Sequence, residues 1–467
     1  MKHLIPLLIA LLTTTGTLLA EAPLLEKLKQ IKKVSDVRQL KATPFAEVYE
    51  FYYEQPVDHQ APEKGVFKQY VQVGHRDFRS PVVAVLEGYS VRGTEESELS
   101  RLFKANQVTI EHRFFKHSVP ATGEIPWGEL TIAQAAADQH EIIQALRQGL
   151  YPDVKWISTG ISKGGQTTIF HRFFYPDDVE ISVPYVAPLN LARVDPRLAR
   201  HLARLGKTPA RRASQGIVGS IVGSEEREVA LRILSFQQYC FERLDRLMPL
   251  AEEQAGEEKL TFARVGGVER ALKLVILEFP FAFWQWNGDV NEIPETSLDE
   301  AGLEDAAGVY EYLAEVSPPH FFSDQSILDI QPFYYAALTE IGMYAYDTRE
   351  FRKYFKGDPG HGSIDFSFAM PDGVEAPPFD EKQMQRVSRW LQTDAEKMLF
   401  IYGGRDPWAG TAVELGSNDK CRKFVKADAN HECKVESFEP IIKREIVDTI
   451  DAWLKGKAGI AVPEFVP

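Results

Sequence analysis

The sequence predicts an α/β protein whose doubly wound, mostly parallel sheet carries an inserted helical cap domain. Strand-like and helix-like segments alternate over residues 81–186, which is typical of a sheet covered by helices on both faces. The alternation stops over residues 191–385, where helical periodicity dominates, and strand-like character returns at residue 397. We therefore expect one sheet domain, formed by residues 21–190 and 386–467, with a cap between its two parts.

The first expected strands, residues 46–53 and 67–73, alternate polar and apolar side chains and therefore indicate antiparallel pairing. Residues 81–86 form a nearly continuous apolar run, which is typical of a parallel strand buried on both faces. The other expected strands are 107–110, 154–159, 181–186, 397–402 and 423–426, and the expected helices include 131–150, 166–174, 225–248, 259–277 and 440–454.

The first twenty residues have the pattern of a secretory signal peptide. Lys2 and His3 form a short polar start, an apolar stretch follows, and the small Ala20 precedes the charged Glu21 at the expected cleavage position. An uncleaved membrane anchor is the alternative, but the apolar run is short for a bilayer span. We therefore expect residues 1–20 to be removed and the mature protein to be secreted or periplasmic and free of the membrane.

The charge balance argues against a nucleic-acid partner. The chain has 53 basic and 67 acidic residues, a formal net charge of −14, and no long basic cluster. Such a chain matches phosphate backbones and anionic lipid poorly. The sequence does not predict an oligomeric state.

Three cysteines occur, at positions 240, 421 and 433. In an exported protein two of them can pair. Cys421 and Cys433 are close in sequence and are the pair we expect, with three reduced, buried thiols as the alternative.

A five-residue motif, Gly160-Ile161-Ser162-Lys163-Gly164, matches the nucleophile elbow Gly-x-Ser-x-Gly of α/β-hydrolases. An apolar strand is expected before it and a helix after it, as that elbow requires. The strained turn would lift the Ser162 hydroxyl above the sheet edge, and glycines two residues away on either side would avoid a collision. An ordinary helix N-cap serine is the alternative.

A serine nucleophile needs a base, and in this fold the chain order is Ser, acid, His. Asp406 directly follows the strand expected at 397–402, and His431 is the only one of eleven histidines beyond it. We expect His431 to take the Ser162 proton and Asp406 to fix the imidazole tautomer. A turn aspartate and a surface-loop histidine are the alternatives.

An oxyanion site is expected beside the nucleophile. The backbone N–H of Lys163 is one expected donor, and its side chain could also hold the elbow by a salt bridge. The second donor is expected after the strand at 81–86, from the backbone of Glu87-Gly88-Tyr89 or from the Tyr89 hydroxyl. A packing role for Tyr89 is the alternative.

No metal or phosphate-binding motif is found in the sequence. His112 and His117 lack the spacing of a zinc-binding helix, and Gly160 to Gly165 lacks that of a P-loop. We therefore expect neither a metal nor a cofactor.

Several motifs occur together and in a fixed order: Glu111 to Phe115, Gln134 to His140, Ser158 to Gly165, Tyr175 to Val179 and Tyr185 to Pro188. Together they resemble the secreted prolyl tripeptidyl aminopeptidase family of serine peptidases, which is related to the lysosomal prolyl carboxypeptidase family. The resemblance covers about residues 49–190 and 398–431. It implies release of short peptides, often tripeptides ending in proline, from a free N-terminus, with Ser162, Asp406 and His431 as the triad.

A free substrate N-terminus is an ammonium group and needs a carboxylate in a partly dry pocket. Glu87 and Glu111 follow two expected strands, at the sheet edge where such folds bind ligands. We expect one of them to anchor the amine. A structural salt bridge, such as Glu111 with Arg113 or Lys163, is the alternative.

The aromatic run at residues 279–286 offers an apolar surface for a proline ring. Its Phe281, Phe283, Trp284 and Trp286 could line such a pocket, and core packing within a helix is the alternative. Other interpretations of the whole chain are an esterase or lipase with the same elbow, a carboxypeptidase, and an inactive binding protein. The intact Ser162, Asp406 and His431 argue against the last.

Overall fold

The protein is described by a computed structural model that covers residues 24–41, 44–205, 219–286, 290–294, 306–358 and 362–456. Only the backbone is described for residues 219–228 and 290. The signal peptide expected at residues 1–20 lies outside the described residues. Within these ranges, no helix combines the length and the apolar character needed to cross a bilayer.

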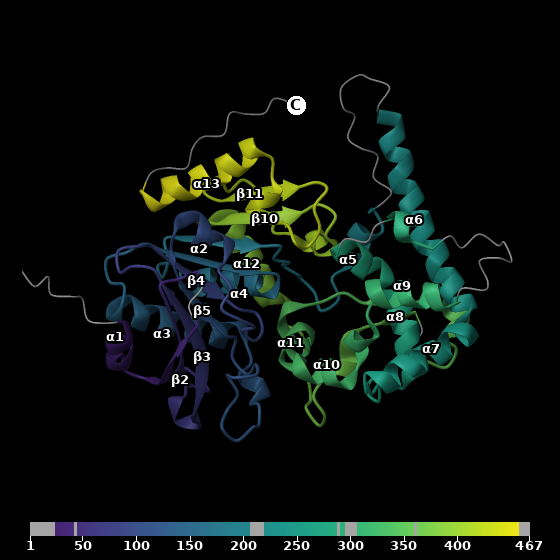
Figure 1. Ribbon diagram of the computed structural model, residues 1–467, viewed down its shortest axis with the longest axis horizontal. Coiled ribbons are helices and arrows are strands. Elements are labelled where there is room, and N and C mark those ends of the chain that lie inside the picture. The colour runs from purple at the N-terminus through teal and green to yellow at the C-terminus, as the bar shows by residue number, and fades with distance from the viewer. Residues whose placement is uncertain are drawn as a thin grey trace, which may run out of the picture.

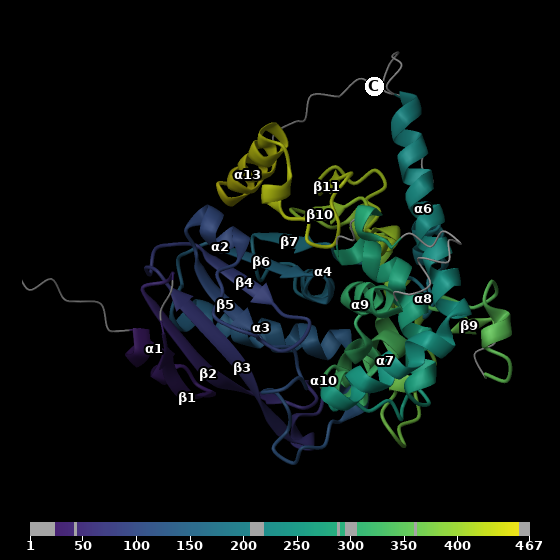
Figure 2. The same ribbon diagram turned by 45° about the vertical axis from the view of Figure 1, so that its right-hand side comes forward.

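A single large sheet organises the described chain (Figures 1 and 2). The three pairings that involve β1, β2 and β3 are antiparallel, and every pairing from β5 to β11 is parallel. In sheet order the strands are β1 (Val34–Leu40), β2 (Glu47–Pro56), β3 (Val66–His75), β5 (Asn106–Ile110), β4 (Val82–Leu86), β6 (Trp156–Ile161), β7 (Ile181–Tyr185), β10 (Leu399–Gly403) and β11 (Arg422–Lys426).

Helices cover both faces of this sheet, which confirms the doubly wound prediction. Helices α1 (Leu24–Gln30) and α3 (Ile132–Gly149) pack into one hydrophobic cluster with alternate residues of β4, namely Val82, Ala84 and Leu86. Helices α2 (Glu98–Phe103) and α13 (Pro440–Leu454) pack into another cluster that contains Val83. Successive side chains of a strand point to opposite faces, so a strand covered on both sides must be apolar throughout.

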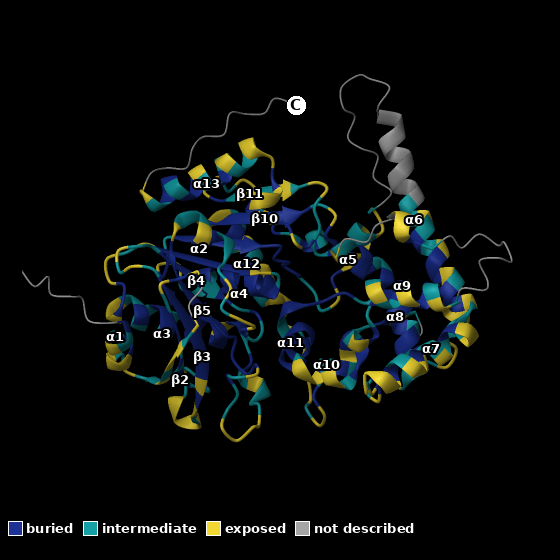
Figure 3. Ribbon diagram, viewed as in Figure 1, coloured by how far each residue is buried: buried dark blue, intermediate teal, exposed yellow. Residues whose placement is uncertain are grey.

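The middle of the sheet is therefore dry. Strands β5, β7 and β10 are buried along their whole length (Figure 3). Helix α4 (Lys163–Phe174) follows β6 directly and packs against β6 and β7. The sequence pattern identified every strand of the sheet except β1.

The chain between β7 and β10 is mostly helical, and most of it gathers beside the sheet, at the right of Figures 1 and 2. Two short strands, β8 (Tyr346–Asp347) and β9 (Ser363–Ile364), pair within it and were not predicted. Its helices are α5 (Pro196–Leu202), α6 (Gly219–Glu242), α7 (Leu244–Glu257), α8 (Val268–Trp286), α9 (Ala306–Val316), α10 (Asp324–Asp329), α11 (Gln331–Ala336) and α12 (Glu381–Thr393).

The predicted end of the cap at residue 385 falls inside α12, which packs against α4 of the sheet domain. The division of the chain into domains otherwise stays a prediction. We use "cap" below for the described residues between 191 and 380.

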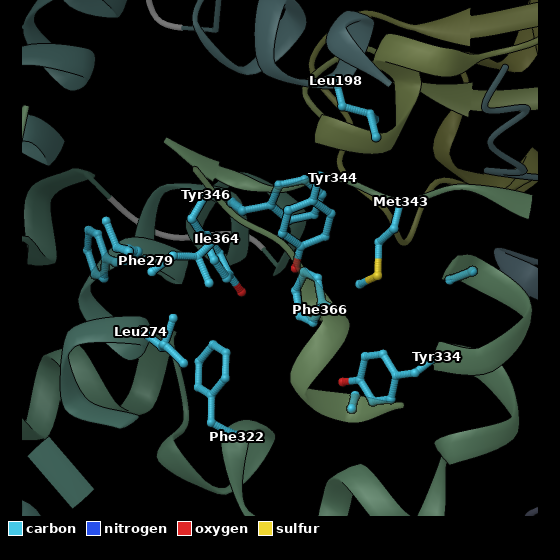
Figure 4. Packing of buried hydrophobic residues seen from close by; sticks show 14 of the residues in the cluster. Leu198, Leu274, Phe279, Phe322, Tyr334, Met343, Tyr344, Tyr346, Ile364 and Phe366 are labelled. Carbon is cyan, nitrogen blue, oxygen red and sulfur yellow. The ribbon is translucent and has the colours of Figure 1, made fainter. Parts of the chain in front are cut away.

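Aromatic residues form the interior of the cap. The ring centres of Tyr344 and Tyr346 lie 5.1 and 5.4 Å from that of Phe366, and 5.7 Å from each other. Figure 4 shows these three rings grouped with Ile364 and Met343 nearby. Their packing fixes two phenol hydroxyls within a dry environment, which matters for the site below.

The expected disulfide is wrong, because all three cysteines are free and buried. Cys421 belongs to the cluster that joins the cap to the sheet, and its thiol lies 3.4 Å from the carbonyl oxygen of Ala395. Cys433 belongs to the cluster beneath α13, and its thiol lies 3.3 Å from the carbonyl oxygen of Tyr402. Closeness in sequence therefore does not bring the two sulfurs together.

We expect a thiol-specific reagent to titrate three cysteines in concentrated guanidinium without reductant, and very few in the native protein. Burial keeps the native thiols from the reagent and raises their pKa, to about 12 for Cys433. A single titratable thiol after unfolding would show that a disulfide forms after all.

Candidate active site

Ser162 lies at the turn between β6 and α4, with backbone angles φ 58° and ψ −120°. Few residues other than glycine adopt a positive φ, so the turn is strained. Its N–H donates to the carbonyl oxygen of Tyr185 at 2.9 Å, and its own carbonyl accepts from the N–H of Gln166 at 3.0 Å. The Ser162 side chain makes no capping hydrogen bond, so it does not act as an ordinary N-cap.

Two glycines allow this turn to pack backbone against backbone. A Cβ on Gly160 would collide with the carbonyl oxygen of Gly164. Gly88 lies in the loop that follows β4, and a Cβ on it would lie 2.6 Å from the backbone nitrogen of Gly164. The loop expected to supply an oxyanion donor therefore lies directly against the elbow.

Asp406 and His431 form a buried pair at the ends of β10 and β11. The Nδ1 atom of His431 lies 2.7 Å from Oδ2 of Asp406, and the two residues are 4% and 0% exposed. The other carboxylate oxygen accepts from the N–H of Trp408 at 3.0 Å. Because an ionised carboxylate only accepts hydrogen bonds, Nδ1 is the donor in this pair, and in the neutral imidazole Nε2 then carries the lone pair.

The loop that carries His431 is held against the loop that carries Asp406. The N–H of Gly404 donates to the carbonyl of Lys426 at 2.7 Å, and that of Arg405 to the carbonyl of Ala429 at 2.9 Å. A Cβ on Gly403 would collide with the carbonyl oxygen of Asn430. The pair Gly403-Gly404 at the end of β10 is the feature of the sequence that could have indicated this close contact.

The cap contributes to the position of the imidazole. The N–H of His431 donates to the carbonyl oxygen of Gln285 at 3.2 Å, in the last turn of α8. The ring of Trp286 lies edge-on to the imidazole, with 5.6 Å between the ring centres. Sequence reasoning proposed Trp286 for a proline pocket and missed Gln285, because a backbone contact leaves no trace in residue type.

Ser162 and His431 line one cleft of about 790 Å³ between the sheet and the cap. No hydrogen bond joins their side chains within the described part of the chain. Hydrogen bonds between catalytic groups are often long in unliganded enzymes and shorten when substrate binds. The arrangement can thus support nucleophilic attack by a serine assisted by an imidazole base.

Tyr89 lines the same cleft, while the Lys163 side chain points into the protein. The Lys163 ammonium lies 5.7 Å from the ring centre of Tyr89 and 5.4 Å from that of Phe115, and burial lowers its pKa to about 7. The expected Lys163 salt bridge is not formed with any described residue. Burial raises the pKa of the Tyr89 phenol, so this group stays protonated and able to donate.

Glu111 does not reach the cleft. Its carboxylate is fully buried and accepts from the N–H of Val91 at 2.9 Å, the N–H of His117 at 2.9 Å and the hydroxyl of Ser118 at 2.8 Å. It therefore ties two loops together and has no room for an amine. A structural ion pair is formed instead, but with another partner, because Nδ1 of His117 lies 3.0 Å from Oε2 of Glu111, while Arg113 pairs with Asp138 at 2.7 Å.

Glu87 and Trp284 are also outside the described lining of this cleft. Burial and the nearby Glu111 charge raise the pKa of Glu87 to about 7. Trp284 lines a separate groove beside α5 and α6. Of the four substrate-binding candidates, the structure brings Trp286 alone to Ser162 and His431.

No group of three or more His, Cys, Asp or Glu side chains in the described ranges is arranged to hold a metal ion.

Comparisons with known proteins identify the family to which the chain is similar. The PS-10 peptidase S37 family matches residues 24–464. A prolyl tri/tetrapeptidyl aminopeptidase from Streptomyces mobaraensis is 31% identical over 388 residues, which cover 81% of this chain and 74% of that protein.

Solved structures give weaker matches. A proline iminopeptidase from Mycobacterium smegmatis is 11% identical with a TM-score of 0.41, and the match covers 87% of this chain and 99% of that one. An α/β hydrolase from Novosphingobium aromaticivorans is 13% identical with a TM-score of 0.34, over 91% and 98%.

We expect Gly403→Ala to slow labelling of Ser162 by a fluorophosphonate probe by about 100-fold, the loss that a misplacement of about 1 Å can cause. The added Cβ would displace Asn430 and with it His431. Gly128→Ala is the control, because a Cβ there meets nothing within 4 Å. Equal labelling rates in the two variants, with both folded by circular dichroism, would contradict this account of the loop contact.

Proposed function

Since the chain belongs to the PS-10 peptidase S37 family and is a serine peptidase with an α/β-hydrolase fold, we propose that it is an aminopeptidase-type exopeptidase. It releases short peptides, chiefly tripeptides that end in proline, from substrates with a free N-terminus. The observation that carries this proposal is the buried Asp406–His431 pair, which opens onto the same cleft as the strained Ser162.

The proposed reaction proceeds through an acyl-enzyme. His431 Nε2 takes the proton of the Ser162 hydroxyl as Oγ bonds to the carbonyl carbon of the third residue. The imidazolium then gives that proton to the departing amine as the carbon–nitrogen bond breaks. Water next attacks the ester while His431 accepts its proton, and return of that proton to Oγ frees the peptide acid. Asp406 keeps the imidazole in the required tautomer and stabilises its charged form.

Two donors would stabilise the tetrahedral intermediate. The backbone N–H of Lys163 begins α4 directly after the nucleophile, where helix N–H groups are unpaired and the helix dipole favours negative charge. The loop at Gly88 and Tyr89 packs against this turn and supplies the second donor. Such donors, aimed at the developing oxyanion, commonly contribute 10²–10³-fold in rate.

Specificity for proline would come from the aromatic lining of the cleft. Trp286, Phe333 and Trp408 line it together with Ser162. A proline residue has no backbone N–H that needs a hydrogen-bond partner, and burial of its apolar ring against aromatic faces is favourable. The relative from Streptomyces mobaraensis, named a prolyl tri/tetrapeptidyl aminopeptidase, supports the same substrate class.

The proposal includes export. The polar start, apolar stretch and small residue at position 20 support cleavage of a signal peptide and release of the mature enzyme outside the cytoplasm.

We expect mass spectrometry of digests to show tripeptides removed from the N-terminus of peptides with proline at position three. N-acetylated copies of the same peptides should stay intact, because the ammonium is absent. Ser162→Ala should lose at least about 10³-fold in kcat/KM while it keeps its fold, since only the hydroxyl is removed. Loss of residues from the C-terminus would instead indicate a carboxypeptidase, and hydrolysis of simple esters alone an esterase.

A further inference from the structure

Glu278 is a buried carboxylate in the wall of the catalytic cleft. Four glutamates occur in its described lining, and Glu292, Glu315 and Glu432 are exposed, whereas Glu278 is 6% exposed. A carboxylate removed from water is costly to keep ionised unless a cation or several donors satisfy it. Exposed glutamates interact only weakly with a cation, because water screens their charge.

The protein satisfies one half of this carboxylate. The hydroxyls of Tyr344 and Tyr346 donate to the same oxygen, Oε2, at 2.9 and 2.7 Å. Both rings are fixed by the aromatic packing around Phe366 (Figure 4). No described residue donates a hydrogen bond to Oε1, and no described lysine, arginine or histidine makes an ion pair with Glu278.

In the free protein, the negative charge of an ionised Glu278 is therefore only partly compensated by the described residues. Burial raises the pKa of Glu278 to about 7, and the two tyrosine hydroxyls lower it only in part. A cation brought into the cleft would hold the carboxylate ionised and would use the remaining oxygen. Perturbed carboxylates of this kind are concentrated at functional sites.

Helix α8 fixes the distance between this carboxylate and the catalytic groups. Glu278, Ala282, Gln285 and Trp286 line the cleft from one face of the helix, and the last two contact His431. The rise from Glu278 to Gln285 or Trp286 is roughly 10–12 Å at about 1.5 Å per residue. Three residues of extended peptide span about 10 Å.

We propose that Glu278 binds the N-terminal ammonium of the substrate and thereby sets the length of the released peptide at three residues. This inference rests on the proposed aminopeptidase function and assigns its amine-binding site. The ammonium donates to Oε1, while the tyrosine hydroxyls hold Oε2 and orient the carboxylate. The site replaces Glu87 and Glu111, which the structure does not bring to the cleft.

The test removes the charge from each partner in turn. One substrate is an Ala-Ala-Pro anilide, and the other is propionyl-Ala-Pro anilide, which has the same shape without the amine. In the native chain, kcat/KM for the amine substrate should exceed that for the propionyl substrate by about 30-fold or more, as expected for a buried charged partner. In Glu278→Gln, which still accepts from both tyrosines, the two values should agree within about threefold.

Controls separate this result from a general loss of structure. Glu315→Gln changes an exposed glutamate of the same cleft and should keep the native ratio, since screened charges contribute little. The rate of Ser162 labelling by a fluorophosphonate should be unchanged in Glu278→Gln. With anilides of one to four residues, native kcat/KM should peak at three, and the Glu278→Gln profile should be flatter.

Equal turnover of the two substrates by the native chain would overturn both the inference and the proposed requirement for a free N-terminus. A Glu278→Gln enzyme that keeps the native ratio and the peak at three residues would overturn the inference alone. The proposed function fails in a different way, through the absence of peptide release or through attack at the C-terminus in the native protein.

Discussion

The hydrogen bond between Asp406 and His431 is the interaction on which the proposed chemistry depends. It is buried on both sides and leaves one imidazole nitrogen free toward the cleft. Three parts of the fold converge to hold it: the end of β10, the loop after β11 and the last turn of α8. The cap is thus part of the proposed catalytic arrangement, because the Gln285 carbonyl accepts a hydrogen bond from the backbone N–H of His431.

The sequence predicted the features that depend on local pattern. The apolar run at 81–86 predicted a strand covered on both faces. The chain order selected Ser162, Asp406 and His431. Of these, Ser162 and His431 line one cleft, and His431 shares a hydrogen bond with Asp406. Strand β1 was missed, and its burial pattern shows no regular alternation. Strands β8 and β9 are too short for any periodicity.

The features that depend on packing between distant segments could not be predicted. Glu111 and Glu278 are both glutamates, yet one ties two loops together and the other faces the cleft with one oxygen unpaired by described residues. The difference arises from Tyr344 and Tyr346, which lie more than sixty residues from Glu278 in sequence. Likewise, Cys421 and Cys433 are close along the chain but belong to separate clusters.

A crystal structure of the enzyme phosphonylated by an alkyl fluorophosphonate tests the central claim most directly, because the adduct resembles the tetrahedral intermediate. The account predicts phosphorus bonded to Ser162 Oγ, one phosphonyl oxygen accepting from the N–H of Lys163, and His431 Nε2 within hydrogen-bonding distance of the adduct, with the Asp406 contact retained. A modified residue other than Ser162, or an imidazole that stays out of reach of the adduct, would contradict it.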